Sequence, residues 1–486
     1  MNSPSKPSSG LCWRIIRAVL ALALVSGLGT WLAPGLGLAS SHGRRTTPPQ
    51  GEPRPPLAWT PTRHDRLLVL APHPDDESAA CGGLTVQALQ AGAGVHVVYV
   101  TNGDGFRVAA ERVFERTHIS PSDYLKLGAM RQRESLGALA RLGLSKKDVT
   151  FLGYPDKGLN QMWLHYWGSE RAYTSRYTKE DHNSYRDSLR PGGPYCGRAL
   201  LDDLEAVMRR FRPTVVLAPH PSDAHGDHWA LYCYTVAGLY ELGLLDRVEL
   251  RLYLVHRADR WLSPKGGFLD PTAPPQQSDE LGTRWSLLPL SSETAQRKRE
   301  AIMQHHTQLL VMRDFLLNFA RNRERFGQIP FGPLADVAPG AIRVDGKGDD
   351  WAQLPLALPC RGSQPGKRVP AAAHITQVQV ARDPRKLFVL LDLGGSPSAD
   401  LSCQVHLRLL SRGQVGPPTT YVLHPGRQCP GVEFHIQGSR LELSLPWPHQ
   451  SPSDAIMLSA DSWRGSSGLD STPWVVLRAQ PVVSAH

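Results

Sequence analysis

The chain has 486 residues, of which 41% are hydrophobic and 20% charged, and its formal net charge at pH 7 is +10. This length is enough for two to three domains with a sizeable core. The positive charge alone would suit a nucleic-acid partner, but no run of Lys and Arg is interleaved with aromatic residues. We therefore expect no nucleic-acid binding.

The N-terminus has the pattern of a targeting segment. Basic residues up to Arg17 precede an apolar stretch at 18–32, and small residues at 37–39 offer a cleavage site. We expect residues 1–39 to be a signal peptide. The alternative is an uncleaved membrane anchor, because the apolar stretch approaches the length that spans a bilayer. Either way the protein is predicted to be exported: periplasmic, secreted or attached to the membrane through its N-terminus.

Strand and helix patterns alternate after a linker. Residues 40–63 are rich in Pro, Ser, Arg and Gly without a hydrophobic period, which indicates a linker. In residues 64–330 the strand-like runs are 67–71, 95–101, 149–152, 215–218 and 250–255. The longest helical pattern extends from 293 to about 325, whereas 262–290 looks irregular. The alternation predicts an α/β domain with a Rossmann-like, mostly parallel sheet and helices on both faces. A glycine-rich dinucleotide fingerprint is missing, which excludes a dinucleotide-dependent dehydrogenase.

Two clusters of histidine and acid follow two of these predicted strands. The first is His73-Pro-Asp-Asp-Glu77, and the second is His225-Gly-Asp-His228, preceded by His220. Catalytic groups gather at the carboxyl ends of strands in such sheets. A catalytic zinc needs about three protein ligands and an open position, and imidazole and carboxylate are both suitable. Together the clusters predict a metal site, with His220 more simply a loop residue.

The two clusters resemble the motifs of the PIG-L/LmbE family of zinc-dependent de-N-acetylases. Residues 73–77 match its first motif, His-Pro-Asp-Asp-Glu. Residues 225–228 match its second, usually His-Pro-Asp-His, with Gly226 replacing proline. Further matches lie at 101–105, 131–134, 151–156 and 298–308, so the resemblance covers about residues 64–325.

The resemblance implies a role for each of these residues. It implies three ligands of Zn²⁺: His73, Asp76 and His228. It implies Asp75 as general base and His225 as the group that stabilises or protonates the tetrahedral intermediate. Arg131 and Asp156 fall where the family contacts the sugar.

Two further acids are assigned supporting roles from their positions. Asp227 is expected to orient a ligand histidine as an outer partner. Glu77 is expected to brace the N-terminus of the helix that follows the first strand, where acids are favoured. Structural alternatives stay open for several residues: a helix-surface pair for Arg131 and Glu134, a turn for Asp156, and a structural histidine for His305.

An aromatic segment interrupts the α/β pattern at 157–197. It contains seven Trp and Tyr residues: Trp163, Tyr166, Trp167, Tyr173, Tyr177, Tyr185 and Tyr195. Long loops in compact domains are often functional. The segment could be a lid or a sugar subsite, or it could simply pack its own aromatic side chains.

The pattern changes at about residue 340. Short alternating runs predict an antiparallel β-sandwich over 340–486. There are seven of them: 377–381, 387–393, 405–410, 421–423, 432–436, 441–445 and 474–477. Residues 342–351 resemble the opening of a family 9 carbohydrate-binding module, which implies sugar binding, although its tryptophans are more simply core residues. Cys360, Cys403 and Cys429 could form one disulfide in an exported protein.

The sequence thus predicts a zinc hydrolase that removes an N-acetyl group from an amino sugar of a glycoconjugate or polysaccharide. Two alternatives stay open. One is a zinc amidase acting on a non-sugar acyl amide. The other is a catalytically silent glycan-binding protein.

Overall fold

The computed structural model describes residues 59–256, 281–359, 369–411, 413–447 and 455–479. The expected targeting segment at 1–39 and nearly all of the linker at 40–63 lie outside these ranges, so both stay predictions. No helix in the described ranges has the length and apolar character needed to cross a membrane. The described residues belong to one unit that begins at Pro56.

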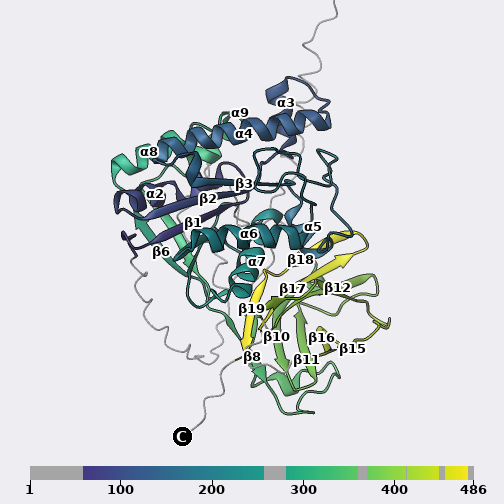
Figure 1. The fold of residues 1–486 in the computed structure, drawn as a ribbon. Coiled ribbons are helices and arrows are strands. Elements are labelled where there is room, and N and C mark those ends of the chain that lie inside the picture. The colour runs from purple at the N-terminus through teal and green to yellow at the C-terminus, as the bar shows by residue number, and fades with distance from the viewer. Residues whose placement is uncertain (1–58, 257–280, 360–368, 412, 448–454, 480–486) are drawn as a thin grey trace, which may run out of the picture. The chain divides into compact units, whose positions relative to one another are not determined.

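A seven-stranded sheet forms the first part of this unit (Figure 1). Its strands are β1 (Arg66–Ala71), β2 (Gly94–Thr101), β3 (Val149–Tyr154), β4 (Val215–Pro219), β5 (Glu249–Tyr253), β6 (Arg284–Pro289) and β7 (Arg323–Gln328). They lie in the order β3-β2-β1-β4-β5-β7-β6. The first five are parallel, and β7 and β6 are antiparallel additions. The predicted α/β class with a mostly parallel sheet is therefore confirmed.

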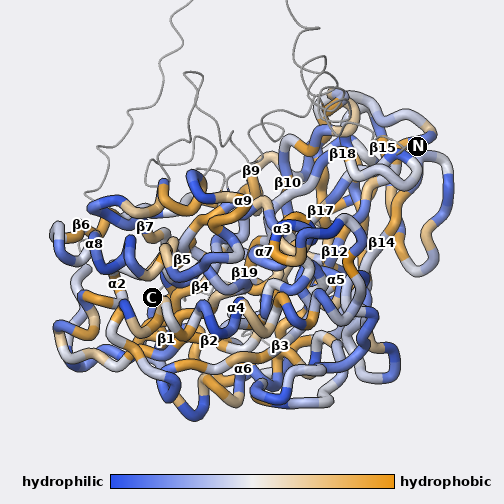
Figure 2. The backbone as a smooth tube through the Cα atoms, turned by 90° about the horizontal axis from the view of Figure 1, so that it is seen from above, coloured by the Kyte–Doolittle hydropathy of each residue, from blue (hydrophilic) through white to orange (hydrophobic). Residues whose placement is uncertain are grey.

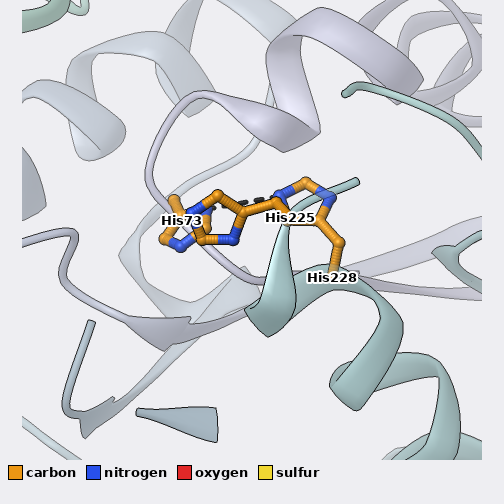
Figure 3. A group of neighbouring side chains, drawn as sticks. All are labelled: His73, His225 and His228. Carbon is orange, nitrogen blue, oxygen red and sulfur yellow. Dashed lines mark hydrogen bonds between the residues drawn. The ribbon is translucent and has the colours of Figure 1, made fainter. Parts of the chain in front are cut away.

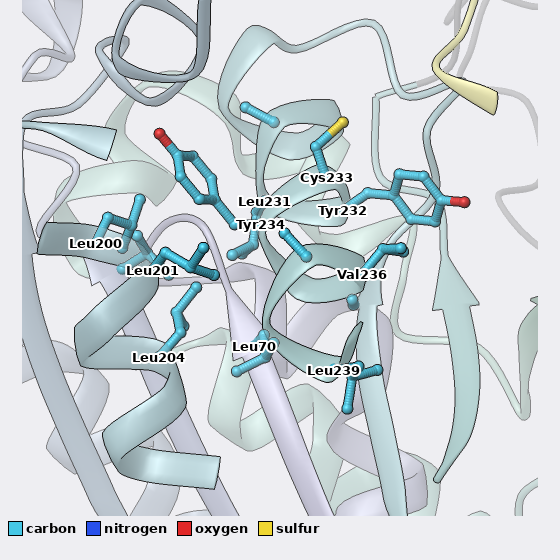
Figure 4. Close-up of a cluster of buried hydrophobic side chains, with 14 of the residues drawn as sticks. Leu70, Leu200, Leu201, Leu204, Leu231, Tyr232, Cys233, Tyr234, Val236 and Leu239 are labelled. Atoms are coloured by element: carbon cyan, nitrogen blue, oxygen red, sulfur yellow. The ribbon is translucent and has the colours of Figure 1, made fainter. Parts of the chain in front are cut away.

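Helices cover both faces of this sheet. They are α2 (Asp76–Gln90), α3 (Arg107–Phe114), α4 (Pro121–Leu142), α5 (Leu159–Leu164), α6 (Gly197–Phe211), α7 (Gly226–Glu241), α8 (Ser292–Ile302) and α9 (His306–Leu317). Alternate residues of β1 enter different cores, as a strand with period two requires. Leu67 and Val69 pack with α2, α4 and α8, whereas Leu68 and Leu70 pack with α6 and α7 (Figure 4). Figure 2 shows β1, β2 and β4 as mainly hydrophobic segments, consistent with burial on both faces.

The strand order creates one point where the chain reverses its direction of growth. It builds outward from β1 to β2 and β3, then returns to the other side of β1 with β4. Ligand sites in open α/β sheets lie outside the carboxyl ends of the strands that flank such a point. His73 lies in the loop after β1, and His228 lies in the first turn of α7, which follows the loop after β4, so the two sequence clusters meet there.

The long helix predicted at 293–325 is wrong. The segment forms α8, a break at 303–305, α9 and then strand β7. At the break, Glu134 of α4 caps α9, because its carboxylate accepts from the backbone N–H of Thr307 at 2.9 Å and from its hydroxyl at 2.7 Å. Glu134 and Arg131 are thus not the ordinary surface pair that was left open. Strand β6 likewise occupies part of the stretch expected to be irregular.

The C-terminal part is a twelve-stranded, mostly antiparallel sheet. Its strands are β8 (Gly332–Asp336), β9 (Leu356–Pro359), β10 (Ile375–Arg382), β11 (Lys386–Leu393), β12 (Leu401–Ser411), β13 (Gln414–Val415), β14 (Thr419–Leu423), β15 (Glu433–Gln437), β16 (Arg440–Pro446), β17 (Ala455–Arg464), β18 (Ser467–Ser471) and β19 (Val475–Ala479). Strand β8 pairs in parallel with both β10 and β19 and joins two antiparallel groups. The sandwich arrangement and the boundary at 340 stay predictions.

The structure shows the burial of three tryptophans and the state of two cysteines in this C-terminal part. Trp351, Trp447 and Trp474 are buried, as the core interpretation predicted. Cys403 and Cys429 are free thiols, so the structure does not join these two in the expected disulfide. Cys360 lies outside the described residues.

Candidate metal centre

The loop between β1 and α2 brings three acids and one histidine to the carboxyl edge of the sheet. Asp76 is the first residue of α2, and its Oδ2 accepts from the backbone N–H of His73 at 3.0 Å. Asp75 has a φ of 132°, which is rare for a residue with a side chain. Its N–H donates to Glu77 Oε2 at 3.1 Å. Backbone strain of this kind persists where surrounding contacts over-determine it and is common at functional sites.

Three side-chain atoms from these loops form a nearly equilateral triangle. His73 Nδ1 lies 3.3 Å from Asp76 Oδ2 and 3.3 Å from His228 Nε2. His228 Nε2 lies 3.2 Å from Asp76 Oδ2. All three side chains are buried. Two imidazole nitrogens and one carboxylate oxygen thus converge on one point between β1 and β4.

His225 stands beside this triangle and completes a second possible donor set. Figure 3 shows the rings of His73, His225 and His228 gathered at the helix start. Each offers a nitrogen, and these nitrogens lie within 4.8 Å of one another. The triangle with Asp76 has edges of 3.2–3.3 Å. This close spacing favours Asp76 as the third donor.

Carboxylates hold the outer nitrogen of each buried histidine. His73 Nε2 lies 3.1 Å from Asp227 Oδ2 and 3.3 Å from Asp156 Oδ1. His228 Nδ1 lies 3.1 Å from Asp223 Oδ2. A carboxylate only accepts, so an outer nitrogen that faces one carries an N–H, and the inner nitrogen of each ring is turned toward the common point. This is the outer-partner arrangement that orients metal-binding histidines.

Asp227 in turn is fixed by the loop after β3. Its Oδ2 accepts from the backbone N–H of Lys157 at 2.7 Å, and its Oδ1 from that of Leu159 at 3.0 Å. The side chain has no exposed surface. Asp227 therefore links His73 to the start of α5, and its expected role as an outer partner of a metal ligand stays a prediction.

The same contacts determine the protonation of the centre. Burial opposes the charged forms, but the carboxylates Asp156, Asp227 and Asp76 raise the pKa of His73 well above its ordinary value. Burial also opposes ionised His228, but Asp223 and Asp76 raise its pKa to about 9. Against the effect of burial, His228 and His73 hold the pKa of Asp76 well below its usual range. The donor set thus favours a bound cation, whether protons or a metal ion.

Asp75 has the opposite electrostatic character to its neighbour Asp76. Burial raises the pKa of Asp75 to about 7, with Arg131 opposing the shift and Asp76 adding to it. A carboxylate with a pKa near neutrality accepts and releases protons under physiological conditions. The different surroundings of the two adjacent acids therefore give them different roles. Asp76 is ionised and can donate to a metal, whereas Asp75 can accept a proton.

His225 is the N-cap of α7. Its Nδ1 accepts from the backbone N–H of Asp227 at 3.2 Å, which leaves Nε2 as the N–H donor. Burial, together with His73, lowers the pKa of His225 to about 4. At neutral pH it is thus an uncharged ring with one hydrogen to donate.

Arg131 lies under the β1–α2 loop, 3% exposed. It donates from Nη1 to Gly103 O at 2.7 Å and from Nη2 to Pro74 O at 2.6 Å. Its Nη2 also lies 3.4 Å from Asp75 Oδ2. Arg131 therefore holds Asp75 in place, and its contact with a sugar stays a prediction.

Glu77 and His305 form a brace on the other side of the loop. His305 Nε2 lies 3.2 Å from Glu77 Oε1, and both side chains are buried. Burial opposes both charged forms, yet the pair raises the pKa of His305 and lowers that of Glu77. The expected bracing by Glu77 agrees with these contacts, and His305 is structural in them.

The sequence interpretation missed Asp223 and His256. Asp223 accepts from the backbone N–H groups of Val255 and His256 at 3.1 and 3.0 Å and faces His228. His256 lies after β5, with its ring 4.4 Å from that of His228. Asp223 stands two residues before His225, so proximity to the second motif could have indicated it. His256 follows a strand and has no neighbouring motif in the sequence.

The aromatic segment packs partly upon itself and partly against the rest of the protein. Trp163, Tyr185 and Tyr195 are buried, and the hydroxyl of Tyr185 donates to Asp104 Oδ2 at 2.7 Å. Tyr166, Trp167, Tyr173 and Tyr177 are half-buried. The aromatic side chains are thus held in the fold by their own neighbours and by other elements, and a role of the segment as a lid or sugar subsite stays a prediction.

Comparisons with known proteins support the family resemblance. A model of the PIG-L family, described as GlcNAc-PI de-N-acetylase, matches residues 68–238. A 1D-myo-inositol 2-acetamido-2-deoxy-alpha-D-glucopyranoside deacetylase of Mycobacterium leprae is 29% identical over 38% of this chain and 53% of its own length. That of Rhodococcus jostii is 30% identical over 37% of this chain and 54% of its own length. The chain spans about half the length of the curated relatives it matches.

Solved deacetylases resemble the chain only weakly. The A40926 pseudoaglycone deacetylase Dbv21 is 22% identical with a TM-score of 0.37, covering 55% of this chain and 97% of its own. The N,N'-diacetylchitobiose deacetylase of Pyrococcus horikoshii is 19% identical with a TM-score of 0.34, covering 55% and 86%. These TM-scores are too low to support a conclusion about this chain. The similarity is carried by the family match: residues 68–238 resemble the PIG-L family, described as GlcNAc-PI de-N-acetylase.

Proposed function

We propose that the protein is a zinc-dependent hydrolase that removes the N-acetyl group of an amino sugar. The observation that carries this proposal is the triangle of His73 Nδ1, Asp76 Oδ2 and His228 Nε2, with edges of 3.2–3.3 Å. Tetrahedral zinc with ligands at about 2.0–2.1 Å has ligand–ligand separations of about 3.3–3.4 Å. The donors are thus already spaced as zinc would need them, with a fourth position free.

These three residues would hold the ion, and their environments suit it. Zn²⁺ in such a site lowers the pKa of a bound water and polarises an amide carbonyl. The buried carboxylates Asp223 and Asp227 face the outer nitrogens of the two histidines and so turn the inner nitrogens toward the ion. The negative charges of the buried carboxylates around these residues also offset the two positive charges of a zinc ion.

Asp75 would take the proton of the attacking water. Its pKa of about 7 lets it be ionised as a base and then carry the proton to the leaving nitrogen. Arg131 fixes its position through the Pro74 carbonyl and the Asp75 carboxylate. A base with this orientation needs no rearrangement at the moment of reaction.

His225 would donate from Nε2 to the oxygen on which negative charge develops. Because its Nδ1 accepts from the N–H of Asp227, the donor hydrogen is directed away from the helix. A fixed neutral donor of this kind stabilises an oxyanion. Asp156, which lies 3.3 Å from His73 Nε2, would present its remaining acceptor capacity to a sugar hydroxyl, with Arg131 as second contact.

The substrate class rests on the family. The matched model and the curated relatives are named as deacetylases of glucosamine derivatives. We propose an N-acetylglucosamine-type glycoconjugate or polysaccharide met outside the cytoplasm, with the C-terminal sheet contributing to glycan binding.

Acetate release from a panel of N-acetylglucosamine compounds tests this proposal. Purified protein should release acetate, lose this activity with a chelator and regain it on addition of Zn²⁺. Release from non-sugar acyl amides alone would favour the amidase alternative. No release from a protein shown to contain zinc would favour the silent glycan-binding alternative.

A further inference from the structure

A pocket lies away from the metal centre, along the β3 edge of the seven-stranded sheet. It has a volume of about 450 Å³ and is lined by α4, β3, the end of α6, residues 146–147 and residues 187–189. Strand β3 is the last strand of the sheet on this side. Segments from five parts of the domain therefore converge on one concave surface.

The charge of this pocket is strongly unbalanced. Four cations line it: Arg133, Lys146, Lys147 and Arg210. Asp187 is the one carboxylate among the lining residues. Within the described ranges, none of the four cations has an ion-pair partner within 4.0 Å. Like charges held together without counter-charges repel one another, and an anion that binds among them relieves this.

The cluster of four cations is not explained as a device that keeps the edge strand β3 from pairing with another chain. Charged side chains often shield an edge strand from pairing with another chain. Here the cations belong to neighbouring segments, and β3 contributes only Val149, Thr150 and Phe151 to the lining. The edge is moreover already covered, because the N–H of Leu189 donates to Phe151 O at 2.8 Å.

One of the cations is held in position by the floor of the pocket. Arg210 donates from Nη2 to Thr150 Oγ1 at 3.3 Å. The same hydroxyl lies 2.9 Å from His96 Nε2. Burial and the nearby Arg210 charge lower the pKa of His96 to about 4. His96 is therefore neutral at physiological pH and does not add to the charge of the pocket.

The walls of this pocket also support the metal centre. Gln132 lines the pocket and donates to Asn102 Oδ1 at 3.1 Å. Its neighbour Arg131 donates to Gly103 O and contacts Asp75. Ser188 lines the pocket and donates to the carbonyl of Tyr185 at 2.6 Å, and Tyr185 donates to Asp104 beside the centre. One helix and one loop therefore separate the two sites.

We propose that this basic pocket binds the anionic group, phosphate or carboxylate, of a sugar. Guanidinium and ammonium donors at one mouth match the several acceptor oxygens of such a group. The sugar part of this inference rests on the proposed function, whereas the anion part does not. The anion can belong to the glycan being deacetylated or to a separate anionic molecule, and the tests below distinguish these sources.

The first test measures binding without reference to activity. Glucose 1-phosphate and glucose are titrated calorimetrically into the zinc-loaded full chain and into the double variant Lys146→Glu/Lys147→Glu. We expect glucose 1-phosphate to bind the wild type and to bind the variant roughly tenfold or more weakly. Glucose, which has no anionic group, should not bind in this pocket in either the wild type or the double variant. The matched control Arg112→Glu/Arg299→Glu reverses two exposed charges elsewhere and should leave binding unchanged.

The second test locates the anion. If it belongs to the substrate, the pocket variant loses kcat/KM through a raised KM on a phosphate-bearing N-acetylglucosamine compound and keeps it on a neutral one. If it belongs to a separate molecule, binding of glucose 1-phosphate weakens while kcat/KM on both compounds is unchanged. Either pattern supports the pocket.

Two results would overturn the inference. One is equal affinity of wild type and pocket variant for glucose 1-phosphate, including no measurable binding to either. The other is an equal loss in the control variant, which would show an effect of net charge alone. The binding test needs no turnover. A protein that binds glucose 1-phosphate but releases no acetate would therefore contradict the proposed function and still support the anion-binding pocket. Unchanged circular dichroism and zinc content exclude unfolding of the variants.

Discussion

Arg131 Nη2 lies 3.4 Å from Asp75 Oδ2 and donates to the carbonyl of Pro74 at 2.6 Å. The guanidinium therefore contacts both the side chain and the preceding backbone of the residue proposed as base. It also opposes the upward shift that burial imposes on the pKa of Asp75. A residue expected to contact substrate thus also controls the protonation of the base.

Replacing Arg131 should move the acid limb of the activity profile. Asp75 works as a base only when ionised, so kcat/KM rises with pH through its pKa. Without the opposing guanidinium this pKa rises further, and in Arg131→Met we expect the limb to shift upward by roughly one pH unit. Arg112→Met, on the surface of α3, is the control. An unshifted limb in Arg131→Met would contradict the coupling.

Asp75 and Asp76 should fail in different ways when changed. Asp75→Asn keeps the shape and the metal ligands, so zinc content should be unchanged while kcat/KM falls by about 10²–10⁴. Asp76→Ala removes one corner of the donor triangle, so zinc should be lost together with activity. Metal analysis beside steady-state kinetics checks both. Loss of zinc from Asp75→Asn would show that the two assignments are mistaken.

Asp223 should act through His228. Its carboxylate lies 3.1 Å from His228 Nδ1 and orients the ring. Asp223→Asn should weaken zinc affinity by about 10–100-fold. Competition with a fluorescent zinc chelator measures this, and Asp181→Asn at an exposed position provides the control. Equal affinities in wild type and Asp223→Asn would rule out the orienting role.

His220 should make the native state sensitive to acid. Burial lowers its pKa to about 3, with Nε2 3.0 Å from Thr283 Oγ1. Between about pH 6.5 and 3 the unfolded chain binds a proton at His220 that the native state does not, so stability falls as pH falls. The contribution is about 1.4 kcal/mol per pH unit.

Urea unfolding at several pH values checks this prediction. The free energy of unfolding should fall less steeply with acid in His220→Gln than in wild type. His64→Gln, at an exposed position, should retain the wild-type slope. Parallel curves for wild type and His220→Gln would contradict the prediction.

Arg408 of β12 should stabilise the contact between the C-terminal sheet and α5. Its guanidinium lies 3.8 Å from the ring centroids of both Trp163 and Trp167 and donates to Trp163 O. It is fully buried, and burial lowers its pKa to about 9. Arg408→Ala removes two cation–π contacts and leaves a cavity, so we expect a loss of about 3 kcal/mol. Arg427→Ala, at an exposed position, should change stability by less than about 0.5 kcal/mol. Urea denaturation measures both, and equal stabilities would refute the role of Arg408.

Local patterns were sufficient for the parallel strands and for the ends that carry chemistry. The runs before His73 and before His220 are apolar and bounded by proline, and both became buried strands. The helix at 293–325 was predicted wrongly because its break depends on a cap from Glu134, 173 residues away in the chain. Strand β17 was missed for a related reason, since its burial depends on pairing with β12 and β19.

The sequence by itself determined which residue types stand at the ends of β1 and β4, because strand and helix periodicity are local properties of the chain. Only the tertiary structure decided that His73 and His228, 155 residues apart, meet at the point where the strand order reverses. It also decided which acids serve them: Asp223 and Asp227 hold the rings, Asp76 completes the triangle, and Asp75 has a raised pKa. These roles depend on distance and burial, which arise only when the sheet brings separate loops together.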